Sequence, residues 1–228
     1  MEYNNEGDEG MAVDELVKRL AKLDTCAVSD ALDRLALRGS VVGLRPLSSQ
    51  ERIAGRAVTV KLKSKGSEES TRHLGTAAVE AADPGDVIVI DHRGRQDVAG
   101  WGGILSTAAK VKGVSGVVVD GACRDVDESR ELGLPVFARS GVQITARGRI
   151  VEESTNEIIE IAGVVVAPGD LVIADGSGVV FVSAERAEEV ISAAETIAAR
   201  EAEMTKAVKE GHSVVEVMGR NYETMLSR

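Results

Sequence analysis

The sequence predicts an α/β fold in which strands and helices alternate through the middle of the chain, whereas the later part is mainly β. Residues 114–119 form a nearly continuous apolar run that is rich in β-branched side chains, typical of a strand that is buried on both faces of a sheet. Helical patterns precede and follow this strand, over residues 104–112 and 126–132. The turn-and-strand sequence at 84–91 recurs at 168–175, which predicts two related strands in one domain.

Two helices are predicted near the N-terminus. Residues 1–13 are acidic and polar, and we expect a flexible tail there, ahead of a single domain that spans 14–228. Leucines spaced along one face predict a helix over 14–23. A second helix is expected to follow Thr25 and to stop at Gly39.

The remaining elements are mostly short, apart from the last. In chain order we expect a strand, a helix and three further strands, at residues 53–63, 71–82, 141–151, 163–167 and 178–182. A long final helix is predicted over 184–209, with Gly211 as its stop signal. The predicted architecture is therefore an α/β core with N-terminal helices and a long C-terminal helix.

The composition excludes several classes of protein. The chain has 228 residues, of which 43% are hydrophobic, and this suits a compact globular protein. Aromatic residues make up only 2%, too few for stacking on single-stranded nucleic acid. The formal net charge of −10 also argues against a phosphate-backbone partner, so we expect no nucleic acid. A small anionic substrate remains compatible with this charge, provided that an arginine lies at its site.

Cellular location is predicted from what the sequence lacks. Cys26 and Cys123 form no metal-binding pattern and are expected to be buried thiols in a reducing compartment. No apolar run approaches the roughly 18 residues that cross a bilayer, and the N-terminal segment has no apolar signal core. We therefore expect a cytoplasmic protein without a membrane partner. Its histidines, His73, His92 and His212, are interpreted as surface or packing residues, with the alternative that His73 and His92 approach a site from loops.

The most informative stretch begins at the buried strand and ends at Arg124 and Asp125. The pair lies between this strand and the following helix, at the strand end where open α/β folds place their chemistry. One interpretation is a local ion pair or helix cap. The other is a functional site, which is favoured by the upstream loop 100–103, since this loop holds three glycines and the only tryptophan.

A second anomaly lies in the final helix, where a carboxylate interrupts an apolar face. Steps of three and four residues place on this face Val190, Ala194, Ile197, Glu201, Met204 and Val208. Burial of a carboxylate without a partner is costly. Glu201 therefore either pairs with a core arginine or reaches solvent, or the helix docks on a neighbouring subunit and Glu201 serves a shared site.

Several motifs fall in an order that identifies a family. They are AGRAVTV (54–60), PGDV (84–87), the loop and helix 102–109, GVVVDG (116–121), the Arg124-Asp125 pair and LPVF (134–137). On these motifs, from about residue 14 to 217, the chain resembles the RraA-like family. This family includes the class II 4-hydroxy-4-methyl-2-oxoglutarate / 4-carboxy-4-hydroxy-2-oxoadipate aldolases.

The resemblance implies a swivelling β/β/α sandwich that assembles as a homotrimer or homohexamer, with active sites between subunits. By resemblance, Arg124 binds the oxygens of a pyruvate-like group, and Asp125 helps to hold a divalent metal, Mg²⁺ or Mn²⁺. Glu201 falls in the region from which a neighbouring subunit's acid approaches the waters of that metal. Arg124, Asp125 and Glu201 are thus the predicted catalytic residues, and Asp125 is the predicted metal ligand.

The glycine loop is the predicted substrate-binding segment, together with Arg124. Backbone N–H groups of Ile104 and Leu105 follow Gly102 and Gly103 at the start of a helix, where they can cradle a carboxylate. The sequence departs from the aldolase pattern at Gly103, because the aldolases that it resembles carry an acid there. Other aspartates are candidates to replace this outer-shell acid: Asp91, Asp97 and Asp120.

These expectations lead to two functional hypotheses. The first is a metal-dependent lyase that cleaves a small 2-oxo acid by retro-aldol reaction, or decarboxylates oxaloacetate, through a pyruvate enolate. The second is a non-catalytic regulator that binds a ribonuclease, as some family members do, since an acidic surface suits a basic protein partner.

Overall fold

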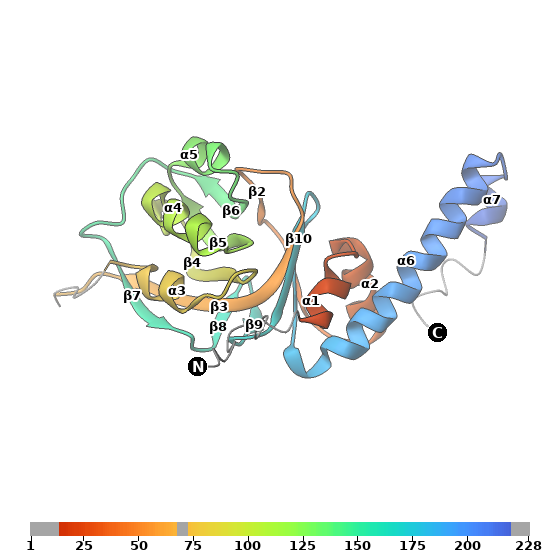
Figure 1. The fold of residues 1–228 in the computed structure, drawn as a ribbon, viewed down its shortest axis with the longest axis horizontal. Coiled ribbons are helices and arrows are strands. Elements are labelled where there is room, and N and C mark those ends of the chain that lie inside the picture. Colours follow the sequence, from red (N-terminus) through yellow and green to blue (C-terminus); the bar gives the residue numbers. More distant parts are fainter. Residues whose placement is uncertain (1–13, 68–72, 220–228) are drawn as a thin grey trace, which may run out of the picture.

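The computed structural model describes residues 14–67 and 73–219, so the predicted tail at 1–13 lies outside the described residues (Figure 1). Its helices are α1 (Glu15–Leu20), α2 (Thr25–Arg34), α3 (Thr76–Ala81), α4 (Gly103–Lys112), α5 (Val126–Glu131), α6 (Ala187–Lys209) and α7 (Val214–Val217). Its strands are β1 (Ser40–Val41), β2 (Arg45–Pro46), β3 (Ile53–Ser64), β4 (Val87–Ala99), β5 (Gly116–Cys123), β6 (Val136–Gly141), β7 (Ile150–Thr155), β8 (Ile159–Ile161), β9 (Val164–Val166), β10 (Leu171–Asp175) and β11 (Gly178–Val182).

A mixed sheet forms the body of the molecule. Its strand order in the described part of the chain is β1-β11-β10-β3-β4-β5-β6-β2, with β7 pairing to β3, and β8 and β9 form a separate hairpin. Strands β3 to β6 run parallel to one another, whereas β10 and β11 are antiparallel. The predicted α/β fold with a long C-terminal helix is confirmed.

The two strands that follow the Pro-Gly-Asp turns, β4 and β10, both pair with β3. β3 pairs in parallel with β4 through Ala57 and Val87, and antiparallel with β10 through Arg56 and Leu171. β3 also pairs with β7 near its carboxyl end. The long strand β3 therefore joins the βαβ part of the chain to the later β part.

Strand β5 has the burial that its sequence predicts. All eight of its residues are buried, as expected for a central parallel strand with both faces covered. On one side of the sheet, α3 and α4 cover a cluster that includes Ile88, Val117 and Trp101. At the end of the sheet that holds β10 and β11, helices α1, α2 and α6 pack against these two strands around Leu171 and Ile191. Figure 1 shows these two groups of helices at separate places on the sheet.

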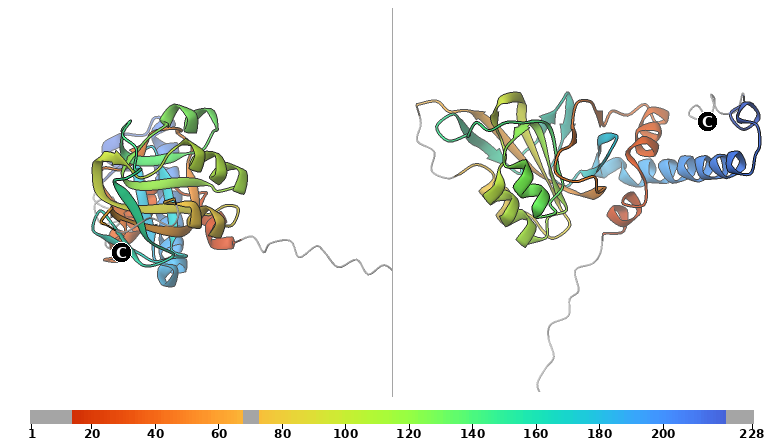
Figure 2. Two further views of the ribbon diagram at one scale, coloured as in Figure 1. Left: turned by 90° about the vertical axis from the view of Figure 1, so that its left-hand side faces the viewer. Right: turned by 90° about the horizontal axis from the view of Figure 1, so that it is seen from above.

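Helix α6 has two unlike halves. Its first half is buried against α1 and α2 through Ala187, Val190, Ala194 and Ile197. Its second half runs away from the sheet, as Figures 1 and 2 show, and leads into α7. The helix ends before Gly211, whose φ of +93° is the left-handed geometry expected of a glycine stop.

Three local predictions are wrong, and each has a physical reason. Gly39 does not stop the second helix, because α2 already ends at Arg34. Glycine is required at residue 39 by packing, since a Cβ there would lie 2.1 Å from the carbonyl oxygen of Phe181. Residues 142–149 form a connection between β6 and β7 instead of a strand, since the carbonyl of Ala146 accepts turn hydrogen bonds from Arg149 and Ile150. Cys26 is exposed, on the outer side of α2.

The other cysteine follows the prediction. Cys123 is buried, and this burial raises the pKa of its thiol to about 12, which makes it unreactive at neutral pH. Within residues 14–67 and 73–219, no helix is both long and apolar enough to cross a membrane.

Candidate active site

The glycine loop is anchored by its tryptophan. Trp101 is 2% exposed, and its indole Nε1 donates to Ser106 Oγ at 2.9 Å. Ser106 Oγ in turn lies 2.8 Å from Ser129 Oγ, which belongs to α5. This buried chain of polar groups ties the loop and α4 to α5. It fixes the positions of the two helix starts that face the candidate site.

The Arg124-Asp125 pair lies where β5 ends and α5 begins. Asp125 has a φ of +56°, a left-handed geometry that aspartate tolerates better than most residues. Its Oδ2 accepts hydrogen bonds from the backbone N–H of Gly103 and from Arg124 Nε, both at 2.9 Å. The backbone N–H of Arg124 donates to the carbonyl of Trp101 at 3.0 Å. The pair and the glycine loop therefore form one connected structure.

The Asp125 carboxylate is held in its ionised form. Partial burial raises its pKa, but the hydrogen bonds from Gly103 and Arg124 outweigh this effect, so that the pKa lies below its ordinary value. Its second oxygen, Oδ1, accepts no hydrogen bond from the described residues. One oxygen is thus oriented by the protein, and the other is available to a ligand.

A cavity of about 100 Å³ opens beside the pair. It is lined by His73, Leu74, Ala99, Trp101, Gly102, Gly103, Ile104, Leu105, Arg124, Asp125, Thr145, Ala146 and Arg147. The predicted substrate-binding residues are therefore brought together with Arg124 and Asp125. A second, open groove is lined by Arg124, Asp125, Val126, Asp127, Glu128, Val142 and Gln143. The charged pair lies between these two recesses.

The cavity is suited to an anion. Helix α4 begins at Gly103, and the N–H groups of Ile104 and Leu105 belong to its first turn, which leaves them without acceptors within the helix. Such N–H groups, with the positive end of the helix dipole, bind carboxylates and phosphates. Two arginines, Arg124 and Arg147, are among the lining residues. The site therefore combines positive charge with one ionised carboxylate, Asp125.

Comparison with known proteins identifies the family of this chain. The family model described as RraA-like, Aldolase/RraA, matches residues 25–181, which is most of the chain. The chain belongs to the RraA-like family. The family prediction made from the motifs is therefore confirmed.

Several relatives share this RraA-like sequence or structure. Protein DlpA of Legionella pneumophila is 28% identical over 206 residues, 90% of this chain, although the chain spans only 34% of that protein. A protein of Halalkalibacterium halodurans, provisionally named 4-hydroxy-4-methyl-2-oxoglutarate aldolase, is 34% identical over 79% of this chain and 82% of its own length. The crystal structure of RraAS2 from Streptomyces coelicolor, described as an unusual member of the RNase ES inhibitor RraA family, has a TM-score of 0.73. It is 26% identical and covers 87% of this chain and 96% of its own.

The RraA-like site offers one carboxylate, Asp125, that is open to a cation. Among the described residues, no three or more His, Cys, Asp or Glu side chains are close enough to enclose a metal ion. A closed zinc site needs four such ligands, whereas Mg²⁺ commonly binds through one or two carboxylates and keeps several waters. Asp125, with its available Oδ1, fits the second kind of site. The donor set thus suits a hard divalent cation.

The aspartates considered as replacements for the missing loop acid are engaged elsewhere. Asp120 accepts from Arg139 and from the N–H of Ala162, and Asp97 pairs with Arg95. Asp91 accepts from a backbone N–H two residues ahead. None of the three lines either recess at the Arg124-Asp125 pair.

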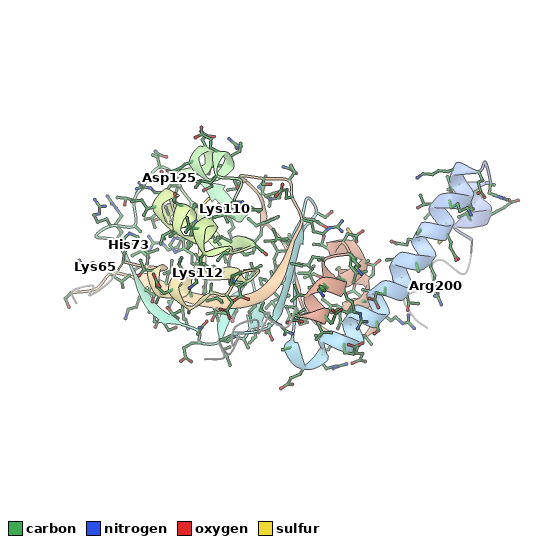
Figure 3. All side chains as sticks on the ribbon, in the orientation of Figure 1. Lys65, His73, Lys110, Lys112, Asp125 and Arg200 are labelled. Carbon is green, nitrogen blue, oxygen red and sulfur yellow. The ribbon has the colours of Figure 1, made fainter. Side chains whose placement is uncertain are left out.

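Glu201 is not brought to this site within one chain. It lies in the outer half of α6, and Figure 3 shows the adjacent Arg200 at the opposite end of the molecule from Asp125 and His73. Burial raises the pKa of Glu201, and Asp30 and Asp24 add to this effect. No ion pair among the described residues includes Glu201, so a core arginine is not its partner. The solvent-exposed interpretation and the neighbouring-subunit interpretation both remain.

Substitution of Glu201 by glutamine distinguishes these interpretations. Because the folded pKa is raised, the ionised carboxylate costs stability at neutral pH. We expect Glu201→Gln to increase the unfolding free energy at pH 7 by less than about 1 kcal/mol. The gain should vanish as the pH falls below about 4, where glutamate is protonated even in the unfolded chain. Thermal unfolding at both pH values measures the difference, with the exposed Glu203→Gln as control. If Glu201→Gln lowers catalytic turnover and Glu203→Gln does not, the result supports a site shared between subunits. If Glu201→Gln leaves catalytic turnover unchanged, the shared site is rejected.

Several site residues have no signal in the sequence. Thr145, Ala146 and Arg147 reach the cavity because the connection after β6 returns across the site, where Ala99 N–H donates to the carbonyl of Ile144 at 3.0 Å. His73 also lines the cavity, and its Nδ1 lies 2.9 Å from the carbonyl oxygen of Leu74. A strand is predicted over 141–151, so nothing in the sequence places Thr145, Ala146 and Arg147 beside Arg124. The predicted loop position of His73, in contrast, allows it to approach a site.

Proposed function

We propose that this RraA-like protein is a divalent-cation-dependent lyase that releases pyruvate from a small 2-oxo acid. The observation that supports it is the juxtaposition, around one cavity, of Arg124, the ionised Asp125 and the free N–H groups at the start of α4. A 2-oxo acid carries a carboxylate and an adjacent ketone. The carboxylate matches the N–H groups at the start of α4, and the ketone oxygen matches the Arg124 guanidinium.

Each group has a distinct task in the proposed reaction. The N–H groups of Ile104 and Leu105 bind the substrate carboxylate, and Arg124 donates to the ketone oxygen, where negative charge grows as the enolate forms. Mg²⁺ or Mn²⁺, when bound at Asp125, supplies further stabilisation of that charge. In the retro-aldol reaction the 4-hydroxyl group gives up its proton and the other fragment leaves as a ketone, whereas in decarboxylation the other fragment leaves as CO₂. In both reactions the electron pair of the broken carbon-carbon bond stays on the pyruvate enolate, which then takes up a proton at carbon. Retro-aldol cleavage and oxaloacetate decarboxylation share this enolate.

The second arginine bears on the choice of substrate. Arg147 lines the same cavity, and its guanidinium donates no hydrogen bond within the described residues. A cation at this place suits a second carboxylate at the far end of the substrate. Dicarboxylic 2-oxo acids such as oxaloacetate and 4-hydroxy-4-methyl-2-oxoglutarate have both carboxylates, which is consistent with the name of the Halalkalibacterium halodurans relative.

Assembly belongs to the same proposal. We propose a homotrimer or homohexamer in which the outer half of α6 reaches a neighbouring subunit and presents Glu201 to the cation's waters. Its placement far from Asp125 in the same chain supports this arrangement, as does Val208, which continues the apolar face beyond Glu201 and is 39% exposed.

The proposed reaction is tested by pyruvate release. Purified protein is assayed with oxaloacetate and with 4-hydroxy-4-methyl-2-oxoglutarate, first with excess chelator and then with added Mg²⁺ or Mn²⁺. We expect turnover only with the cation, because a divalent cation held by Asp125 would add positive charge where the enolate forms, beyond what Arg124 supplies. Absence of cation-dependent pyruvate release from both substrates would reject the lyase.

A non-catalytic regulator is the second candidate function. It is favoured by the structural likeness to RraAS2 and by the net charge of −10, which suits a basic protein partner. Recovery of a ribonuclease in a pull-down, together with no Mg²⁺ or Mn²⁺ binding by calorimetry, would favour this function over the lyase.

A further inference from the structure

The side-chain position of Gly103 is filled by a residue from another helix. A Cβ built on Gly103 would lie 1.9 Å from Glu128 Oε2 and 2.7 Å from Glu128 Oε1. The carboxylate of Glu128 therefore occupies the space that a side chain at residue 103 would enter. Gly103 is the residue at which the aldolase pattern has an acid, so a carboxylate is present there after all.

The fold explains why Glu128 reaches this place. It lies in the first turn of α5, and Asp125 is the N-cap residue of that helix. The next residue, Ser129, is hydrogen-bonded to Ser106 of α4, which holds the two helices together at this level. Asp125 and Glu128 consequently line one groove, with Arg124 beside them.

Charge favours a carboxylate at this position. Helix α4 has no acidic residue in its own first turn, where the helix dipole favours negative charge. Glu128 supplies that charge from α5. Among the described residues it forms no ion pair, whereas its neighbour Asp127 is paired with Arg130. The Glu128 carboxylate is thus placed at the site and remains available.

We propose that Glu128 is the second carboxylate of the cation site, and that it replaces the acid missing at residue 103. It is a positioning residue that accepts a hydrogen bond from a water bound to the cation beside Asp125, as outer-shell carboxylates do. This inference rests on the proposed function. Glu128 is also separate from Asp91, Asp97 and Asp120, which are held by other partners.

The test measures Mn²⁺ binding by calorimetry on the full chain. Glu128→Gln keeps the size of the side chain and removes its charge, and we expect the affinity to fall about 10- to 100-fold. Gly103→Ala should weaken binding similarly, because the added Cβ pushes the flexible end of Glu128 away. Gly103→Asp combined with Glu128→Ala returns an acid to residue 103 and should restore the affinity to within a few-fold of the parent.

Glu131→Gln is the matched control, since Glu131 is an exposed acid on the same helix. It should bind Mn²⁺ like the parent. The inference is overturned if Glu128→Gln also binds like the parent. It is equally overturned if Glu128→Gln lowers only the melting temperature, since Glu128 would then act solely as a charge at the start of α4.

Failure of this inference is distinguishable from failure of the proposed function. Parent protein that releases pyruvate, with Mn²⁺ affinity insensitive to Glu128→Gln, rejects the role of Glu128 alone. Parent protein that binds Mn²⁺ through Glu128 but releases no pyruvate supports the role of Glu128 and rejects the lyase.

Discussion

Replacement of Arg124 by alanine is expected to lower the rate of pyruvate release by about 10²- to 10³-fold. This is the typical effect of removing one donor that stabilises an oxyanion in a transition state. The Arg124 guanidinium is oriented by Asp125 Oδ2 at 2.9 Å and lines the cavity together with the start of α4. Without it, the ketone oxygen loses its cationic donor. Initial rates at saturating Mg²⁺, with oxaloacetate as substrate, measure the effect.

Two further variants make the Arg124 result specific. Arg124→Lys keeps the charge but loses the planar fork, and should recover only part of the rate. Arg130→Ala is the control, because Arg130 lies on α5 and pairs with the exposed Asp127. It should release pyruvate at the parental rate. An Arg124→Ala protein as active as Arg130→Ala would remove Arg124 from the reaction.

Replacement of Trp101 by alanine is expected to lower the unfolding free energy by about 3–5 kcal/mol, the usual cost of truncating a large buried aromatic side chain. Trp101 is 2% exposed and packs in the core under α3 and α4. Its loss also leaves Ser106 without the indole N–H that donates to it. Chemical denaturation followed by circular dichroism measures the change, since the tryptophan signal is lost.

Val111→Ala is the control for Trp101→Ala. Val111 lies in α4, the helix that follows the loop of Trp101, but its side chain is 85% exposed. Its unfolding free energy should stay within about 0.5 kcal/mol of the parent. A Trp101→Ala protein of parental stability would show that the loop is not anchored by the indole.

Local patterns were sufficient to predict much of the fold. Strand β5 and helices α4 and α5 follow from a β-branched run, a helical period and glycine stops, all of which act over a few residues. The position of the Arg124-Asp125 pair follows from the same patterns. The family likewise follows from short motifs in order, and the family model confirms it.

The remaining features depend on contacts between distant segments. The need for glycine at residue 39 comes from the carbonyl of Phe181, which no local pattern contains. The return of residues 142–149 across the cavity is set by hydrogen bonds to Ala99 and Cys123. The approach of Glu128 to Gly103 depends on how two helices pack. The sequence of the loop shows only that Gly103 stands where the aldolase pattern has an acid. It does not show that the side chain of Glu128 fills the space beside Gly103.

The cavity is built from the middle of the chain, apart from the terminal helices. Every residue that lines it falls between His73 and Arg147, within the βαβ part of the fold, whereas α1 and α6 lie outside the segment that the family model matches. The cavity lining thus comes from one contiguous segment of the chain, and the two terminal helices lie outside that segment. In the proposed assembly α6 serves the pocket of another copy and not its own, so a change in α6 would reach the site only through the contact between copies.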